Sequence, residues 1–299
     1  MNYSEYRAIA EISKEFDEFC SWLSENSINY DKTRIHTYKK SLTLVANHFR
    51  QADISNAPKI DQELINIFLE TDALLSIYRG FKASLNDIIK EKLSEAICGP
   101  INYQTENNSS NLSRNTIFEL YIAAHLKSPE IDLVLSKQDE DMSFQIDGFK
   151  VFVECKRPMV KNRIDKNLKN AISQLNGRYK TSKLPAQSKG ILAISITRVQ
   201  NPDQLVLFAK SEQAIGSRLK QIMESFKKEY EAIWRKETDK FTIGVLVHLS
   251  GISMVQNIPY TTNQFMMVYL SNNDRGEDAL MERIMKAIEG KSASVTKLG

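Results

Sequence analysis

The sequence predicts an α/β fold, with a mixed sheet flanked by helices, that is preceded by an all-helical N-terminal domain. Residues 1–98 place apolar side chains at helical spacing throughout. From residue 115 onward, helical patterns alternate with short apolar runs of the kind that form strands. A polar stretch rich in asparagine and serine, residues 103–113, lies between the two parts and is typical of a linker. We therefore expect a helical domain over residues 1–100 and an α/β domain over residues 113–299.

The helical part divides at short polar breaks. Its apolar residues follow helical spacing over three stretches, Phe16–Leu23, Tyr38–Phe49 and Leu64–Leu93. The breaks between helices are expected at Asn26, Asn29–Asp31 and Ser55–Pro58, and the helices end at Cys98-Gly99-Pro100. We expect this domain to serve in recognition, in binding a partner or in dimerisation.

The α/β part begins with a strongly apolar helix over residues 116–126. The pattern after it predicts a strand over residues 131–135, a hairpin over 141–156, a helix over 164–179 and a buried strand over 190–197. It then predicts a long helix over 204–236, two strands over 242–249 and 264–270, and a closing helix over 277–288. The run Gly190–Thr197 is apolar and continuous between turn signals, which is typical of a strand that is buried on both faces.

The composition is that of a globular protein, and the motifs exclude several classes of function. Hydrophobic residues make up 42% of the chain and charged residues 26%, with a net charge of +3. The sequence has no run of about 18 apolar residues that could cross a membrane, and its first residues lack the basic-then-apolar order of a signal peptide. Glycine-rich phosphate loops, dinucleotide fingerprints and a Ser-His-Asp order are also missing, so NTPases, dehydrogenases and serine hydrolases are poorly supported.

The cysteines indicate a reducing compartment. Cys20, Cys98 and Cys155 are odd in number, widely spaced and embedded in apolar patterns. We expect all three to be buried thiols, rather than partners in a disulfide or ligands of a zinc ion. Such cysteine usage predicts a cytoplasmic location.

The hairpin carries the most specific pattern in the chain. An Asp-Gly pair between two alternating runs is the strongest short-range signal for a two-residue turn, and Asp147-Gly148 supplies it. With that turn, Ile146 pairs with Phe149, and Asp141 lies directly opposite Glu154. Alternation then separates an apolar face of Met142, Phe144, Ile146, Val151, Val153 and Cys155 from a charged face of Asp141, Glu154 and Lys156.

The charged face predicts a metal site. Two carboxylates directly opposite each other in a sheet repel, because their side-chain roots are only about 5 Å apart. A divalent cation between them relieves the repulsion, and hard cations such as Mg²⁺ take carboxylate oxygens. We expect Asp141 and Glu154 to bind the ion and Lys156 to hold or polarise a metal-bound water. Asp147 lies about 20 Å from Glu154 at strand rise, so it is a turn residue. The alternative is that the three charged residues form a solvated strand face.

This arrangement resembles the PD-(D/E)xK nuclease superfamily, whose fold is restriction-endonuclease-like. The family pattern is an acid on one strand, a hairpin turn, and Asp/Glu-x-Lys on the next strand, which Asp141, Glu154 and Lys156 match, although Glu140 stands where the family usually has proline. The predicted order α-β-β-β-α-β over residues 113–200 also matches the family core. The resemblance implies a nuclease, dependent on Mg²⁺ or Mn²⁺, that hydrolyses phosphodiester bonds in restriction or antiphage defence, with these three residues as its catalytic set.

Two further site residues follow from the resemblance. Many members have a helix glutamate before the hairpin that points at the metal, and Glu119 is similar to it. A lone glutamate in so apolar a helix needs a partner, although Thr116-x-x-Glu119 also fits a helix capping box. Gln174 is similar to the glutamine of the Gln-then-Tyr helix motif of the RecB-like branch. The motif has a spacing of four residues, whereas Tyr179 follows Gln174 at five.

The charge distribution indicates the substrate. Between Lys150 and Lys183, ten Lys and Arg residues stand against two acids. Phosphate neutralisation supplies most non-specific affinity for nucleic acid, and Lys169 and Arg178 are candidate phosphate contacts, unless they merely face solvent. We expect a nucleic-acid partner, DNA in preference to RNA, no membrane partner, and a homodimer or a regulatory partner protein. The alternative from another class is a non-catalytic nucleic-acid-binding or scaffold subunit of a defence or repair complex that keeps the fold.

Overall fold

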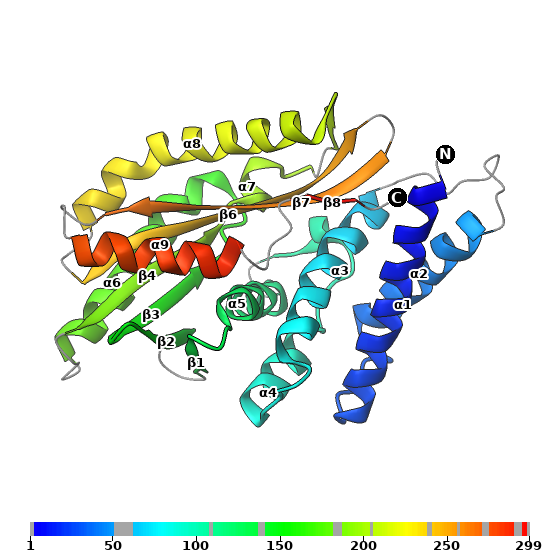
Figure 1. The fold of residues 1–299 in the computed structure, drawn as a ribbon, viewed down its shortest axis with the longest axis horizontal. Helices are drawn as coiled ribbons and strands as arrows, with labels where there is room; N and C mark the ends of the chain where they lie inside the picture. The colour runs from blue at the N-terminus through cyan, green and yellow to red at the C-terminus, as the bar shows by residue number, and fades with distance from the viewer. Residues whose placement is uncertain are drawn as a thin grey trace.

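The computed structural model describes residues 3–50, 62–107, 110–136, 141–181, 187–203, 206–237, 241–255, 258–270, 275–289 and 295–297. Its N-terminal region is helical, as predicted, with α1, α2, α3 and α4 over Tyr3–Glu25, Arg34–Arg50, Gln62–Phe81 and Asp87–Ala96. The predicted break after the first helix is confirmed, whereas the break at Ser55–Pro58 lies outside the described residues. These helices gather at one end of the molecule, with α1 and α2 outermost (Figure 1).

A mixed sheet forms the centre of the remainder. Its strands β1 to β8 span Asp132–Leu135, Met142–Ile146, Phe149–Lys156, Ser188–Ser195, Leu207–Ala209, Thr242–Val255, Ile258–Tyr269 and Val295–Lys297. Within the described residues the order is β1-β2-β3-β4-β6-β7-β8, and β5 pairs with the last residues of β6. The central strands β3, β4 and β6 are parallel, and parallel neighbours need long crossovers. Helices α6 (Ile164–Thr181) and α8 (Glu212–Glu237) lie in these crossovers.

Helices cover both faces of the sheet, which explains why its central strands are apolar throughout. Helices α6 and α8 form one core with alternate residues of β4 and β6, such as Leu192 and Val245. Helices α5 (Leu112–Leu126) and α9 (Arg275–Glu289) cover the opposite face and share a core with Val153 and Ile191. Figure 1 shows α8 on one side of the sheet and α5 and α9 on the other. The short helix α7 (Thr197–Gln200) directly follows β4.

The Asp-Gly hairpin is confirmed residue by residue. Ile146 pairs with Phe149 and Met142 with Val153, which is the predicted register. Asp147 and Gly148 have φ angles of 51° and 80°. Two successive left-handed residues make the turn whose twist matches that of the flanking strands. The predicted apolar face of the hairpin is buried in the core that the sheet shares with α5.

Two elements after β4 differ from the prediction. The long helix expected over 204–236 begins only at Glu212, because Leu207–Ala209 pair with β6 as a strand. The Ser211 hydroxyl then caps α8 by accepting a hydrogen bond from the Ala214 amide at 3.2 Å. The strands expected over 242–249 and 264–270 are longer, since β6 and β7 pair with each other along one extended hairpin.

The cysteine prediction was wrong at one position. Cys20 and Cys155 are buried, whereas Cys98 is exposed, because it lies two residues beyond the end of α4 at Ala96. Its thiol donates to the Ser94 carbonyl. In the described part of the chain, no helix has the length and apolar character needed to cross a bilayer.

The packing crosses the predicted boundary between the two parts. One continuous core joins buried side chains of the N-terminal helices with α5, one face of the sheet and α9. Glu106, in the stretch predicted as a linker, is buried and accepts a hydrogen bond from Arg157, the residue after β3. The division into separately folding domains stays a prediction.

Candidate metal centre

The end of β3 places an acid and a base side by side. Glu154 and Lys156 are two residues apart on one strand, so their side chains leave the same face of the sheet. The Glu154 side chain is buried, with 4% of its area exposed, and Lys156 Nζ lies 2.6 Å from its Oε1 atom. The face is the one covered by α6, because Phe152 of the same alternation packs on Leu175 of that helix.

Asp141 is held against the same strand from the other side of the hairpin. It directly precedes β2, and its Oδ2 atom accepts a hydrogen bond from the Cys155 backbone amide at 2.5 Å. The pairing of β2 and β3 ends at Met142 and Val153, one residue before Asp141 and Glu154, and Asp141 meets β3 through the hydrogen bond that it accepts from Cys155. The hairpin therefore brings both predicted acids to one end of the strand pair.

The two acids disfavour each other's charge. Burial raises the pKa of Glu154, and the neighbouring Asp141 carboxylate raises it further, although Lys156 and Arg178 act in the opposite direction. Burial also raises the pKa of Asp141, against the hydrogen bond from Cys155 and the charge of Lys156. Two carboxyl groups whose pKa values are raised in this way gain free energy from any bound cation.

Glu119 joins the pair from helix α5. Burial and the charge of Asp141 raise the pKa of Glu119 to about 7, and Lys92 of α4 partly offsets this through an ion pair of 2.7 Å. The capping-box interpretation is wrong, because α5 begins at Leu112 and Thr116 lies inside the helix. The Thr116 hydroxyl instead donates to Glu95. Glu119 therefore approaches Asp141 from one side of the sheet while Glu154 approaches it from the other.

Helix α6 carries three candidate site residues, Lys169, Gln174 and Arg178, and one of them lies at this cluster of acids. Arg178 Nη2 lies 3.4 Å from Glu154 Oε2, so the residue predicted as a phosphate contact is also an ion-pair partner of the acid. Gln174 lies one turn earlier on the same side of the helix and is exposed. Lys169 is also exposed and lies 3.9 Å from Glu237, away from the acids. The side chain of Tyr179 is outside the described residues.

Asp147 is a turn residue, as predicted. Its φ angle is left-handed, and its carboxylate forms an exposed ion pair with Arg283 of α9. Asp147 is therefore engaged in an ion pair at the opposite end of β3 from Glu154.

Sequence reasoning missed Lys92, which supplies the counter-charge of Glu119. Lys92 lies in α4, where its spacing to the apolar residues is that of an ordinary solvated lysine. Its contact with Glu119 depends on how α4 packs against α5, and no local pattern in the sequence indicates that packing. The sequence thus predicts that a buried acid has a cationic partner, but it does not predict which residue supplies the cation.

The residues fit a hard cation held by few protein ligands. Among the described residues, no group of three or more His, Cys, Asp and Glu side chains is arranged to hold a metal ion. Mg²⁺, however, keeps several waters and is commonly bound through one or two carboxylates. The buried Glu154 Oε2 atom accepts no hydrogen bond within the described structure, and its ion pair with Arg178 at 3.4 Å is the contact that a bound ion would replace. The two carboxylates of Asp141 and Glu154 would therefore be enough protein ligands for a Mg²⁺ ion that keeps its waters.

Comparison of the sequence with protein-family models and with curated proteins finds no match. The functional conclusion therefore rests on the side chains of this site and on the order of the elements that carry them. That order, α5-β1-β2-β3-α6-β4, places one helix on each face of the hairpin.

Proposed function

We propose that this chain is a Mg²⁺-dependent nuclease with a restriction-endonuclease-like fold. The observation that carries the proposal is the convergence of Asp141, Glu154 and Glu119 at one end of the hairpin, where the charge of Asp141 raises the pKa of both glutamates. Buried acids with strongly perturbed pKa values gather at functional sites. The element order from α5 to β4 is the one that the PD-(D/E)xK resemblance implies, and it supports the same assignment.

Each residue has a distinct role in the proposed reaction. Asp141 and Glu154 hold the ion, which when bound supplies positive charge to the scissile phosphate and makes its water more acidic. Lys156 orients the attacking water, since its ammonium group is anchored on Glu154 while 23% of its side chain stays exposed. Glu119 reaches the same region through water. With its pKa near 7 it can accept or return a proton at physiological pH.

The proposed substrate is nucleic acid, with DNA preferred over RNA. Lys156 and Arg178 are both partly exposed beside the acids, so a phosphate that approaches Glu154 meets two cations first. Charge-assisted contacts of this kind supply most of the affinity for a phosphodiester backbone. A nuclease attached to a separate group of helices fits a role in restriction or antiphage defence, with the helices binding the target or a partner protein.

A cleavage assay tests the proposal. Single- and double-stranded DNA and RNA are incubated with the protein in Mg²⁺ and in EDTA, together with the variants Glu154→Gln and Lys156→Ala. Cleavage should require Mg²⁺ and fall by orders of magnitude in both variants. Asp147→Asn is the matched control, because it removes a carboxylate of the same hairpin at the opposite end of β3 from Glu154, and its rate should stay within about twofold. Cleavage by Glu154→Gln at the wild-type rate would make the site assignment wrong.

One observation favours a second candidate, a non-catalytic nucleic-acid-binding subunit. Each glutamate of the cluster already has a cation from the chain itself, Lys156 and Arg178 at Glu154 and Lys92 at Glu119. A fold that has lost turnover could keep such a neutralised cluster. Binding of nucleic acid in EDTA, without cleavage in either Mg²⁺ or Mn²⁺, would identify this function instead.

A further inference from the structure

A small cavity with both apolar and polar walls lies where the N-terminal helices meet the sheet. Its volume is about 70 Å³, and it is lined by Arg114 of α5, by Arg157 after β3, and by Ser195 and Thr197 at the end of β4. Because one ordered water needs roughly 10–15 Å³ of such volume, the cavity holds about five water-sized atoms, the size of a phosphate group. Ligands of parallel sheets bind outside the carboxyl ends of the strands, and this cavity is in that position.

The walls of the cavity carry an excess of positive charge. Glu70 accepts from both Arg34 and Arg114, and both carboxylate oxygens of Glu106 accept from Arg157. Each glutamate is therefore neutralised. A further guanidinium, that of Arg198, lies 5.1 Å from the centre of the Tyr103 ring, on which Arg114 and Arg157 also stack. Of these charged residues, Arg114, Arg157 and Glu70 line the cavity itself, which gives its walls one net positive charge within the described residues.

Two of these guanidinium groups have hydrogen-bond donors to spare. The Nη1 atoms of Arg114 and Arg157 are buried and donate no hydrogen bond within the described structure. Arg114 Nη1 comes no nearer than 4.0 Å to the Glu106 carboxylate. Their side chains are only 2% and 4% exposed, so bulk water reaches them poorly. A buried charged donor without an acceptor is costly, which indicates that an acceptor enters the cavity.

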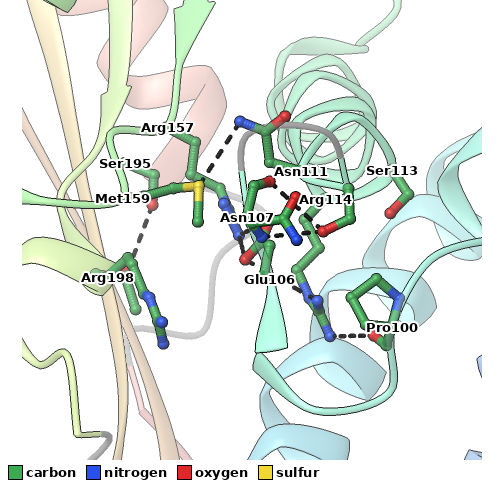
Figure 2. A network of polar contacts seen from close by, with 12 residues as sticks. Pro100, Glu106, Asn107, Asn111, Ser113, Arg114, Arg157, Met159, Ser195 and Arg198 are labelled. Atoms are coloured by element: carbon green, nitrogen blue, oxygen red, sulfur yellow. Dashed lines mark hydrogen bonds and ion pairs between the residues drawn. The ribbon is translucent and has the colours of Figure 1, made fainter. Parts of the chain in front are cut away.

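Hydroxyl groups line the opposite wall. Ser195 donates to Thr197 at 3.4 Å, and the Thr197 and Ser250 hydroxyls lie 3.2 Å apart. His248 borders the cavity and is neutral at pH 7, because burial lowers its pKa to about 3. Figure 2 shows Arg157, Arg198 and Ser195 on one side of this polar network and Arg114 on the other, with Glu106 between them. The site therefore offers the Nη1 groups of two guanidinium ions and the hydroxyls of Ser195, Thr197 and Ser250 to one small ligand.

We propose that this cavity binds a terminal phosphate group. A phosphate is an anion, which the net positive charge of the walls favours, and its oxygens accept hydrogen bonds from guanidinium groups and hydroxyls. Free inorganic phosphate and the terminal phosphate of an oligonucleotide present this same group. The assignment does not depend on nuclease activity, since none of the lining residues belongs to the metal centre.

Calorimetric titration with inorganic phosphate tests the site. The full chain is titrated in EDTA, so that no metal contributes. The expected result is saturable binding with a stoichiometry of one, accompanied by a rise in melting temperature. The double variant Glu106→Gln with Arg157→Gln removes one guanidinium while keeping a neutral pair, and it should weaken binding at least tenfold. Arg235→Gln, which removes an exposed arginine of α8 that pairs with Glu231 away from the cavity, should bind phosphate as the wild type does.

A second variant keeps the test decisive if the double variant fails to fold. Ala73→Met narrows the cavity from α3 without touching any charge, and it should also weaken binding at least tenfold. The proposal is overturned if wild-type protein binds no phosphate in EDTA, since the cavity then holds only water. It is equally overturned if a folded variant of either kind binds phosphate with wild-type affinity.

Oligonucleotides separate the two sources of the phosphate. The same protein is titrated, again in EDTA, with one oligonucleotide carrying a 5′-phosphate and with its 5′-hydroxyl form. Tighter binding of the phosphorylated form, lost in Ala73→Met, assigns the site to the end of a nucleic acid. Equal binding of both forms, together with saturable binding of inorganic phosphate, assigns it to a free phosphate.

Discussion

Lys92 Nζ of α4 lies 2.7 Å from Glu119 Oε2 of α5, with the two side chains only 15% and 14% exposed. The N-terminal helices thus supply a counter-charge to the cluster of acids that the hairpin forms. Removal of those helices would leave Glu119 beside Asp141 without its cation. The helical region is therefore part of the electrostatics of the proposed metal centre, in addition to any part it plays in recognition.

Stability should fall with rising pH because of Glu119. Its pKa is about 7 in the folded chain and 4.5 ordinarily, since burial and Asp141 outweigh Lys92. Between these values the unfolded chain has lost the proton that the folded chain keeps, so unfolding is favoured as pH rises, by at most roughly 3 kcal/mol. Urea unfolding from pH 4.5 to 8 in EDTA measures the decline. Glu119→Gln should flatten much of it, and an unchanged decline would contradict the assignment.

Glu154→Gln should stabilise the metal-free protein. The pKa of Glu154 is raised in spite of Lys156 and Arg178, so its charged form is disfavoured and a neutral side chain of the same shape is preferred. A gain of about 1 kcal/mol corresponds to a rise of roughly 2 °C in melting temperature for a chain of this size. Scanning calorimetry in EDTA measures it. With added Mg²⁺ the wild type should instead have the higher melting temperature. A lower melting temperature of the variant in EDTA would contradict the prediction and show that the ion pairs of Glu154 with Lys156 and Arg178 outweigh the cost of its burial.

The Asp-Gly turn should control the register of the hairpin. Gly148 has a φ of 80°, and a methyl group there would meet only Gln187 at 3.4 Å, so Gly148→Ala brings backbone strain without a clash. The expected loss is about 1–2 kcal/mol of unfolding free energy. Gly216→Ala is the matched control: this glycine lies in α8 with open space around it, and alanine should gain about 0.5–1 kcal/mol. Equal changes in the unfolding free energy of the two variants, measured by urea unfolding, would contradict the role of the Asp-Gly turn.

The hairpin was predictable because its information is local. Asp147-Gly148 specifies the turn, and alternation from that point fixes which residues face Glu154. The long β6–β7 hairpin was underestimated, because its outer half mixes apolar residues with glycine, proline and hydroxyl residues and so lacks a clear strand pattern. Residues that meet across helices, such as Lys92 with Glu119, carry no local signal. The sequence therefore indicated Lys156 beside Glu154, but not Lys92 beside Glu119.

Glu70→Gln should be strongly destabilising. Glu70 is the shared partner of Arg34 and Arg114, and their charges lower its pKa to about 2 despite its burial. Its replacement leaves two buried guanidinium groups uncompensated, at a cost of about 3–5 kcal/mol. Since the folded pKa lies below the ordinary value of 4.5, the same stabilisation is present above pH 4.5 and is lost as the pH falls toward 2.

Urea unfolding at pH 7 compares this variant with Glu15→Gln. Glu15 forms an exposed ion pair with Arg79, and breaking such a pair costs less than about 1 kcal/mol. Similar losses in both variants would mean that the buried ion pairs between α3 and α5 contribute little to joining the N-terminal helices to the rest of the fold.

Divalent-cation binding by the acid pair is tested most directly by titration calorimetry of the metal-free protein with Mg²⁺ and with Mn²⁺. Wild-type protein should bind either ion saturably, and Asp141→Asn and Glu154→Gln should each weaken binding at least tenfold. Asp147→Asn removes the same charge from the turn of the same hairpin and should bind as the wild type does. Metal affinity that is unchanged in Asp141→Asn and Glu154→Gln, or that is lost in Asp147→Asn instead, would contradict the assignment of the metal centre.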